Sequence, residues 1–255
     1  MAKTTSSELT VPENGWISVG GEAAMGPGWA DGGCGEACWS LRYTSTEAPL
    51  RHLRPEWLYR APVPRTKLTS PAPAARFSGL LEITGSRPIE LEGWPGMVGH
   101  NWGRHTEQYV WGHCNAWDDG DDVVLEGGGG RTRVGGLLLP FRTVLAVRHH
   151  GTAYRMSDLA SVARNESDVT TRRWRFRGRG PRVEVEGEMW AETDDLVGLF
   201  YPNPDGHTIH CLNSKIAHAE VTLRLAGRAP RKLTSARAAL EIGTPDPSHG
   251  VRMHV

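Results

Sequence analysis

Glycine and proline are spread along the whole chain, and this spread limits the possible folds more than any other feature. The 255 residues include 31 glycines and 17 prolines. Both residue types destabilise the interior of a helix. Long helices and helical bundles are therefore excluded, and we expect short strands joined by turns.

Several segments alternate between apolar and polar residues with the period of two that half-buried strands show. Six such segments lie at residues 40–43, 76–83, 172–177, 182–188, 221–225 and 237–242. Only residues 52–60 and 157–164 are candidates for a helical turn or two, and Pro55 limits the first of these. All-β chains of this size usually hide their strand edges in closed barrels or packed sandwiches. The sequence therefore predicts an all-β fold of one of these kinds.

The length of the chain suits one large all-β domain or two small ones, at roughly 100–200 residues per domain. We expect a partly flexible N-terminal segment at residues 1–30. An N-terminal β half at residues 31–134 and a C-terminal β half at residues 135–255 are expected to follow.

Charge and hydropathy exclude several classes of partner. Lys and Arg together number 29, as do Asp and Glu, so the formal net charge is zero. A neutral chain lacks the attraction that drives binding to nucleic acids or anionic membranes. The longest apolar run, residues 137–141, is too short to cross a bilayer, and the N-terminus lacks the apolar stretch of a signal peptide. We expect a cytoplasmic protein with no nucleic-acid partner and no stable membrane insertion.

Cysteine and histidine spacing gives no strong metal signal. The four cysteines form no C-x-x-C pair, so we expect reduced thiols rather than a disulfide scaffold or a zinc ribbon. His100, His105 and His113 could ligate a metal, but their spacing fits no known helical zinc motif and no strand places all three on one face. We expect neither a metal nor another cofactor, and a metal-dependent β-barrel enzyme stays an alternative.

Aromatic side chains are concentrated in residues 94–119, which hold four of the ten tryptophans. If residues 108–117 form a strand, one of its faces carries Tyr109, Trp111, His113, Asn115 and Trp117. A plain core strand would carry aliphatic residues there, because buried imidazole and carboxamide groups cost stability without partners. The face is either the outer face of a sheet or the lining of a ligand pocket. We favour the pocket, because a row of large aromatics is a liability on a solvent-exposed face.

The motif at residues 99–103 reads Gly-His-Asn-Trp-Gly and follows Trp-Pro-Gly at residues 94–96. It resembles the His-Asn-Trp-Gly signature of the tocopherol cyclase and carotenoid 1,2-hydratase relatives. Residues 59–79 and 213–217 resemble further blocks of this family.

The resemblance spans most of residues 30–225. It implies a calycin-like fold with two lipocalin-like β-barrel or β-sandwich halves that enclose an apolar cavity. It also implies a cofactor-independent cyclase, hydratase or isomerase that acts on an isoprenoid or polyene-like substrate. The alternative is a non-catalytic, lipocalin-like carrier of an apolar small molecule.

One position departs from the family pattern. The carotenoid hydratases carry an Asp directly before the His of the motif, where this chain has Gly99. An acid that protonates an alkene must therefore come from elsewhere, and Glu126, Asp118 and Tyr59 are candidates. Glu126 leads if it lies in an apolar cavity with Asp122 on the same face, because one of the two carboxyls would then have a raised pKa. Otherwise Glu126 marks the start of a solvated turn.

The predicted site combines polar residues for catalysis with aromatic residues for binding. The expected catalytic residues are His100, Asn101, His113 and Glu126, and the expected substrate-binding residues are Tyr59, Trp102, Tyr109, Trp111 and Trp117. His100 and Asn101 would orient the polar group of the substrate or a water molecule, and His113 would shuttle a proton. Trp102 and Trp111 would form an apolar wall that stabilises cationic intermediates.

For some of these residues a purely structural or surface role is the alternative. The His100-Asn101-Trp102 motif could simply join a strand entrance to its neighbour, because short polar motifs at glycine turns often do only that. Lys67 and Arg76, although they belong to or lie beside the family blocks, are expected to be solvated surface charges.

Overall fold

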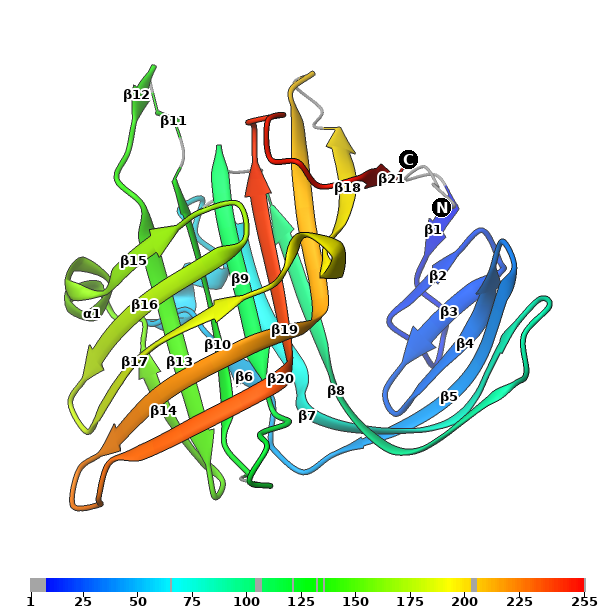
Figure 1. The fold of residues 1–255 in the computed structure, drawn as a ribbon, viewed down its shortest axis with the longest axis horizontal. Coiled ribbons are helices and arrows are strands. Elements are labelled where there is room, and N and C mark those ends of the chain that lie inside the picture. The colour runs from blue at the N-terminus through cyan, green and yellow to red at the C-terminus, as the bar shows by residue number, and fades with distance from the viewer. Residues whose placement is uncertain are drawn as a thin grey trace. The chain divides into compact units, whose positions relative to one another are not determined.

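The chain folds almost entirely into β-strands (Figure 1), and this confirms the predicted all-β class. The computed structural model describes residues 8–64, 66–103, 107–120, 122–131, 133–134, 136–202 and 206–254. Within these ranges the single α-helix is α1 (Leu159–Arg164), and η2 (Glu56–Tyr59) is one of two short 3-10 helices. Both lie inside the two segments for which the sequence predicts helical turns. None of the described helices is long and apolar enough to cross a membrane.

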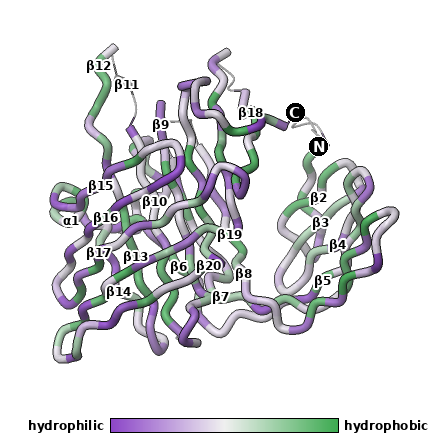
Figure 2. Tube along the Cα trace, viewed as in Figure 1, coloured by the Kyte–Doolittle hydropathy of each residue, from purple (hydrophilic) through white to green (hydrophobic). Residues whose placement is uncertain are grey.

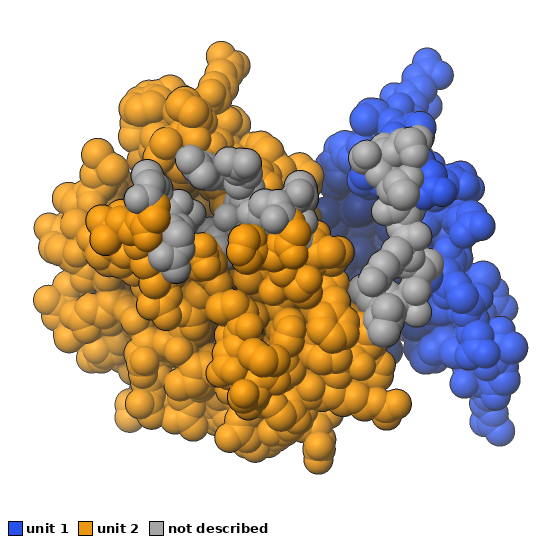
Figure 3. Space-filling model, turned by 90° about the horizontal axis from the view of Figure 1, so that it is seen from above, with its two compact units in different colours: residues 1–48, 72–98 blue, residues 49–71, 99–255 orange. Residues whose placement is uncertain are grey.

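The strands fall into two compact units of the chain, which Figure 3 shows in different colours. Unit 1 comprises residues 1–48 and 72–98, and unit 2 comprises residues 49–71 and 99–255. The predicted division into two β halves, residues 31–134 and 135–255, remains a prediction. The strands on either side of it, β11 (Arg133–Val134) and β12 (Leu137–Leu138), pair with each other, and β10 (Val124–Arg131) and β13 (Arg142–His149) pair over residues 124–130 and 142–148 within unit 2.

Unit 1 is an antiparallel sheet with a small core. Its strands are β1 (Leu9–Thr10), β2 (Ile17–Val19), β3 (Ala23–Gly26), β4 (Trp29–Cys34), β5 (Ala37–Ser45), and the parts of β7 (Thr66–Ile83) and β8 (Ile89–Gly103) at residues 72–83 and 89–98. Tyr43, Ala72, Ala75 and Val98 form the core, against which Phe77 packs. The Tyr43 hydroxyl donates a hydrogen bond to the carbonyl of Gly26, so the one polar atom of this core is satisfied.

Unit 2 contains an eleven-stranded sheet with the order β14-β13-β10-β9-β20-β19-β17-β16-β15, to which β18 and β21 are attached through β19. Its other strands are β9 (Gln108–Cys114), β14 (Thr152–Met156), β15 (Glu166–Val169), β16 (Arg173–Gly180), β17 (Val183–Trp190), β18 (Val197–Pro202), β19 (Thr208–Leu225), β20 (Arg231–Thr244) and β21 (Met253–His254). The short strands β6 (Leu50–Arg51), β11 (Arg133–Val134) and β12 (Leu137–Leu138) also belong to unit 2, and β6 pairs with residues 69–70 of β7. All pairs are antiparallel except β18 with β21.

The core of unit 2 forms because its strands alternate apolar and polar residues, as Figure 2 shows along the chain. Val110 and Cys114 of β9 and Leu125 of β10 are all at most 2% exposed and belong to this core. The indole of Trp174 lies so close to Gly112 and Gly127 that a Cβ at either glycine would meet it within 3.0 Å. The absence of side chains at these two positions therefore makes room for Trp174, one of the two tryptophans of this core.

The strands expected from the alternation are confirmed, and most extend beyond the predicted segments, although β16 and β17 begin one residue later than predicted. The strand predicted at residues 108–117 is β9. It begins at Gln108, as predicted, but ends at Cys114, three residues earlier than expected. Trp117 therefore lies outside this strand. It is 2% exposed, belongs to the apolar core and donates its indole N–H to the carbonyl of Val123 at 2.7 Å.

Candidate active site

The predicted polar face of β9 exists and lies opposite the apolar core. Glu126 of β10 is directly opposite His113, and Gly128 is opposite Trp111. On the other neighbouring strand, Glu241 of β20 is opposite Trp111. Because successive side chains of a strand point to opposite faces, these residues share one face, while Val110, Gly112 and Cys114 point into the core.

Glu126 is the most enclosed acidic group on this face, since its side chain is 0% exposed. The Ser70 hydroxyl lies 2.6 Å from Glu126 Oε2 and 2.8 Å from Oε1, and donates its proton to the carboxylate. Trp111 Nε1 donates a second hydrogen bond to Oε1 at 3.1 Å. Burying a carboxylate is costly unless it is hydrogen-bonded and paired with a positive charge, so these contacts account for only part of its stabilisation.

The charge partner of Glu126 is His52, a residue that the sequence did not single out. His52 Nε2 lies 3.1 Å from Glu126 Oε2, and both side chains are 0% exposed. Nε2 makes no hydrogen bond to a described residue, so the contact with Glu126 is a close ion pair. His52 Nδ1 is buried and has no hydrogen-bond partner among the described residues. We refer to Ser70, Glu126, His52 and Trp111 as the Glu126 cluster.

The expectation that burial raises the pKa of Glu126 is wrong. Burial does act in that direction and is the largest single influence, but it is outweighed by the charges and hydrogen bonds around the carboxyl. His52 contributes most of this opposing effect, followed by His113 and Ser70, and together they lower the pKa of Glu126 to about 2. Glu126 is therefore an ionised carboxylate at neutral pH and does not itself hold a proton to donate.

The expected partnership between Glu126 and Asp122 is also wrong. Asp122 is exposed, and its Oδ2 lies 3.1 Å from Nδ1 of His150. Glu126 is buried within β10 rather than at the start of a solvated turn.

Trp111 reaches Glu126 across a glycine. Its backbone pairs with Gly128, while its indole N–H bonds to Glu126, two residues along β10. A Cβ built at Gly128 would lie 3.7 Å from Cδ1 of Trp111 and 3.1 Å from the carbonyl oxygen of Val110. A Cβ at Gly128 would thus be in ordinary contact with the indole, and its one tight contact would be with the backbone of Val110. The indole ring also stacks with His113, with ring centroids 6.2 Å apart.

A second carboxylate, Glu241, lies on the same face beside Trp111. Tyr109 donates its hydroxyl proton to Glu241 Oε1 at 2.8 Å, and Asn213 Nδ2 donates to Oε2 at 2.9 Å. Burial, and then the charge of Glu241, raise the pKa of Tyr109, so this phenol stays neutral. Burial also raises the pKa of the neighbouring Cys211 thiol to about 12. Glu241 thus receives neutral donors, in contrast to Glu126.

The His-Asn-Trp motif lies at the end of β8, on exposed residues of unit 2. The rings of His100 and Trp102 stack with centroids 5.0 Å apart, and Trp102 stacks in turn on Tyr59 at 5.9 Å. No hydrogen bond, ion pair or ring contact among the described residues joins His100, Asn101 or Trp102 to Glu126. The catalytic roles expected for His100 and Asn101 remain predictions.

Tyr59 connects the motif to the segment that carries His52. Its hydroxyl accepts a hydrogen bond from the backbone N–H of Leu53 at 3.1 Å and donates one to the carbonyl of Leu68 at 2.8 Å. Burial raises the pKa of this phenol. With both hydrogen bonds made inside the protein, Tyr59 holds the loop beside His52, and its expected role in substrate binding remains a prediction.

Lys67 was expected to be a solvated surface charge, and this expectation is wrong. The residue is 6% exposed, and its ammonium donates hydrogen bonds to the carbonyls of Ala61 and Pro64. It closes the loop between η2 and β7, because an ammonium satisfies several carbonyl oxygens at once. Arg76 is exposed, as expected. All four cysteines are free.

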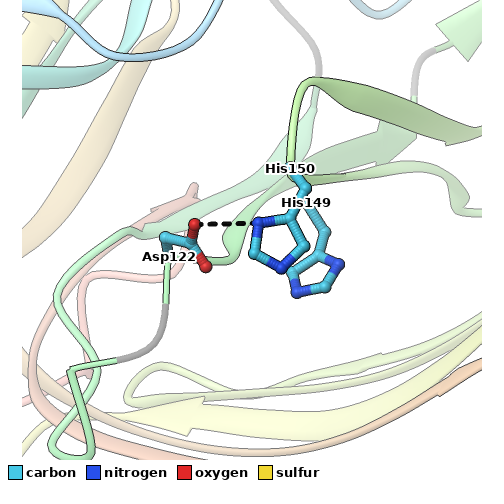
Figure 4. A group of neighbouring side chains, drawn as sticks. All are labelled: Asp122, His149 and His150. Atoms are coloured by element: carbon cyan, nitrogen blue, oxygen red, sulfur yellow. Dashed lines mark ion pairs between the residues drawn. The ribbon is translucent and has the colours of Figure 1, made fainter. Parts of the chain in front are cut away.

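One group of side chains outside the Glu126 cluster has the composition of a metal site (Figure 4). Ligand atoms of Asp122, His149 and His150 lie within 4.8 Å of one another. However, the guanidinium of Arg231 lies 2.7 Å from Nε2 of His149. The guanidinium of Arg228 lies 3.4 Å from Nδ1 of the same ring. Both ring nitrogens of His149 therefore face positively charged groups that only donate, and this arrangement does not favour a metal cation. His105, one of the histidines considered as a ligand, lies outside the described residues.

Two shallow surface hollows occur away from the polar face. The hollow of about 330 Å³ is lined by residues of β15, β16 and β17, and the hollow of about 680 Å³ is lined by residues of unit 1. Neither is lined by a residue of the Glu126 cluster. The aromatic-lined cavity expected from the sequence therefore remains a prediction.

Comparisons with known proteins agree with the resemblance carried by the motif. Two similar solved structures are kievitone hydratase from Nectria haematococca (9% identity, TM-score 0.47, 84% of this chain covered) and a protein described as an AttH from Nitrosomonas europaea (13% identity, TM-score 0.47, 92% of this chain and 71% of that chain covered). The chain spans 64% of the kievitone hydratase. No curated protein matches it. The tocopherol cyclase-like family model matches residues 72–244, which is more than half of the sequence and includes the motif, Glu126 and Glu241. The chain therefore belongs to the tocopherol cyclase-like family.

Proposed function

We propose that the protein is a cofactor-independent enzyme that transfers a proton to a carbon–carbon double bond of an isoprenoid or polyene-like substrate. The observation that carries this proposal is the fully buried ion pair of His52 and Glu126. A buried ion pair is at best a weak source of stability, and perturbed ionisable groups tend to cluster at functional sites. Membership of the tocopherol cyclase-like family supports a cyclase or hydratase rather than an unrelated chemistry.

In this proposal His52, not Glu126, carries the exchangeable proton. The imidazole of His52 lies beside the Glu126 carboxylate, and Ser70 and Trp111 donate hydrogen bonds that hold the carboxylate in place. His52 Nδ1 has no partner among the described residues, so it is the atom from which a proton can pass to the substrate or to an intervening water. The new C–H bond forms as the π bond breaks, and the positive charge moves from His52 to the substrate carbon.

The resulting cation can be quenched in three ways. An internal hydroxyl gives a ring, water gives an alcohol, and loss of a neighbouring proton gives an isomerised double bond. In each case one proton returns to His52, so the enzyme is regenerated. Trp111 supports this step, because a tryptophan face attracts a cation and excludes water from it.

The test is turnover of prenylated quinols and polyenes by purified protein carrying His52→Gln or Glu126→Gln. General acid–base catalysis contributes roughly 10²–10⁴-fold, so we expect a loss of at least about 100-fold in kcat for each variant. Thermal unfolding of each variant gives the folded fraction, to which the rates are normalised. His218→Gln is the matched control, since His218 is a half-buried histidine of β19 that stacks on Trp190 outside the cluster.

Two outcomes would overturn the proposal. Wild-type turnover in His52→Gln would exclude this histidine as the acid. Tight binding of the substrates by the wild-type protein without turnover would instead support the alternative function, a carrier of apolar molecules.

A further inference from the structure

We propose that Lys215 and Glu241, which both lie beside Trp111, form a subsite for a hydroxyl group of the substrate. This inference rests on the proposed function, because it assumes that the apolar part of the substrate lies along Trp111. It concerns the family block at residues 213–217, which the proton-transfer step does not use.

The first observation is the position of the Lys215 ammonium. Its Nζ lies 5.1 Å from the ring centroid of Trp111, although Lys215 is on β19 and Trp111 is on β9, with β20 between them. Lys215 forms no hydrogen bond or ion pair with the described residues. Its three N–H donors are therefore available to an oxygen atom that sits beside the indole.

The second observation is a β-bulge that aims Lys215 in this direction. The pairing of β19 with β20 shifts in register between Ser214 and Ala217. Lys215 and Ile216 are both exposed between the buried residues Ser214 and Ala217, and the Ser214 hydroxyl accepts a hydrogen bond from the N–H of Ile216. Bulges occur often next to active sites, where they re-aim a side chain.

The third observation is an acceptor that also lies beside Trp111. Glu241 faces Trp111 across the β9–β20 pair and is half-buried. Tyr109 and Asn213 each occupy one lone pair of its carboxylate. A carboxylate has about four such acceptor positions, so at least one remains for a ligand.

Together the two residues match a hydroxyl better than other polar groups. Lys215 only donates and Glu241 only accepts, whereas a hydroxyl does both. A carbonyl could not donate a hydrogen bond to Glu241, and the charge of Glu241 would repel a carboxylate. Desolvation lowers the pKa of Lys215, which fits an ammonium held against an indole rather than one in open water.

The experiment compares two probes that share an apolar chain and differ in the polar group, farnesol and farnesene. Equilibrium dialysis measures their dissociation constants for the wild type, Lys215→Met, Lys215→Arg and Glu241→Gln. We expect the wild type to bind farnesol at least about 10-fold more tightly than farnesene, and Lys215→Met to lose this preference without weaker binding of farnesene. Lys215→Arg should retain it, because the charge and donors remain, and Glu241→Gln should reduce it.

Lys232→Met is the matched control, because Lys232 is an exposed lysine on the neighbouring strand β20. Its preference should equal that of the wild type. Equal binding of both probes by the wild type, or an unchanged preference in Lys215→Met, would overturn the subsite. These outcomes concern binding alone, so they are distinguishable from a failure of His52 in the turnover assay. With an active substrate, Lys215→Met should raise KM and leave kcat within about threefold.

Discussion

Glu126 and Glu241 lie on the same face of the eleven-stranded sheet, on strands that flank β9, yet their surroundings differ. Glu126 is fully buried and has an imidazole as charge partner. Glu241 is half-buried and receives hydrogen bonds from a phenol and a carboxamide, both neutral. Trp111 touches both environments, since it donates to Glu126 and pairs in register with Glu241.

This difference separates two tasks that a carboxylate can perform. An imidazole in a closed environment places a group that can carry a proton directly beside Glu126, which suits acid–base chemistry. Neutral donors fix the orientation of the accessible Glu241 carboxylate but leave some of its acceptor positions without a hydrogen bond. Such a carboxylate suits recognition of a ligand. The following predictions break or sharpen this comparison, and their expected effects decrease in order.

The largest effect is expected from His52→Leu. It leaves the Glu126 charge buried without its partner, and breaking a buried pair in this way costs about 3–5 kcal/mol. Denaturant unfolding of the wild type and the variant measures this loss. The double variant His52→Leu/Glu126→Leu should be more stable than His52→Leu alone, because no isolated charge remains. If the double variant is instead the less stable of the two, the buried carboxylate is not the cause.

The next effect is a pH dependence carried by Glu126. Its pKa is lowered from 4.5 to about 2 on folding, so the ionised carboxylate contributes stability above about pH 4.5 and this contribution is lost as the pH falls toward 2. The contribution is at most about 3 kcal/mol. Unfolding free energies of the wild type and Glu126→Gln, measured from pH 6 to pH 2, should converge at low pH by about this amount. A constant difference between the two proteins would contradict the assignment.

The smallest effects are expected from removing one hydroxyl donor at each carboxylate. Ser70→Ala removes a fully buried donor from Glu126 and should cost about 2 kcal/mol. Tyr109→Phe removes a donor from the half-buried Glu241, where water can replace it, and should cost about 1 kcal/mol. Thermal unfolding of the two variants in one buffer compares them directly. Equal losses would show that the two carboxylates are equally desolvated.

The division of β9 into a polar and an apolar face could be predicted from the sequence, because it depends only on the alternation of neighbouring residues. The same reasoning misplaced Trp117, because the strand ends at Cys114 and the alternation no longer applies beyond it. Glu126 could be chosen as a site residue from its position after an apolar run. Its ionisation could not, because burial alone predicts the wrong direction for its pKa.

His52 could not be predicted from the sequence. It lies far from Glu126 along the chain and meets it only because β6 pairs with residues 69–70 of β7. A two-residue strand gives no periodic signal, and the residues that follow it resemble the start of a helical turn. The donor Ser70 was missed for the same reason, although it belongs to one of the family blocks.

The glycines at 127 and 128 have a consequence for how this sequence can vary. Gly127 makes room for Trp174 in the core, and Gly128 lies beside the indole of Trp111 on the opposite face. The run of four glycines reads like a flexible linker, in which a residue could be gained or lost at little cost. Here a deletion or insertion after Glu126 would exchange the two faces of everything that follows in β10. The length of the run should therefore be invariant among functional descendants of this chain, whereas the loops at the ends of the same strand are free to change in length.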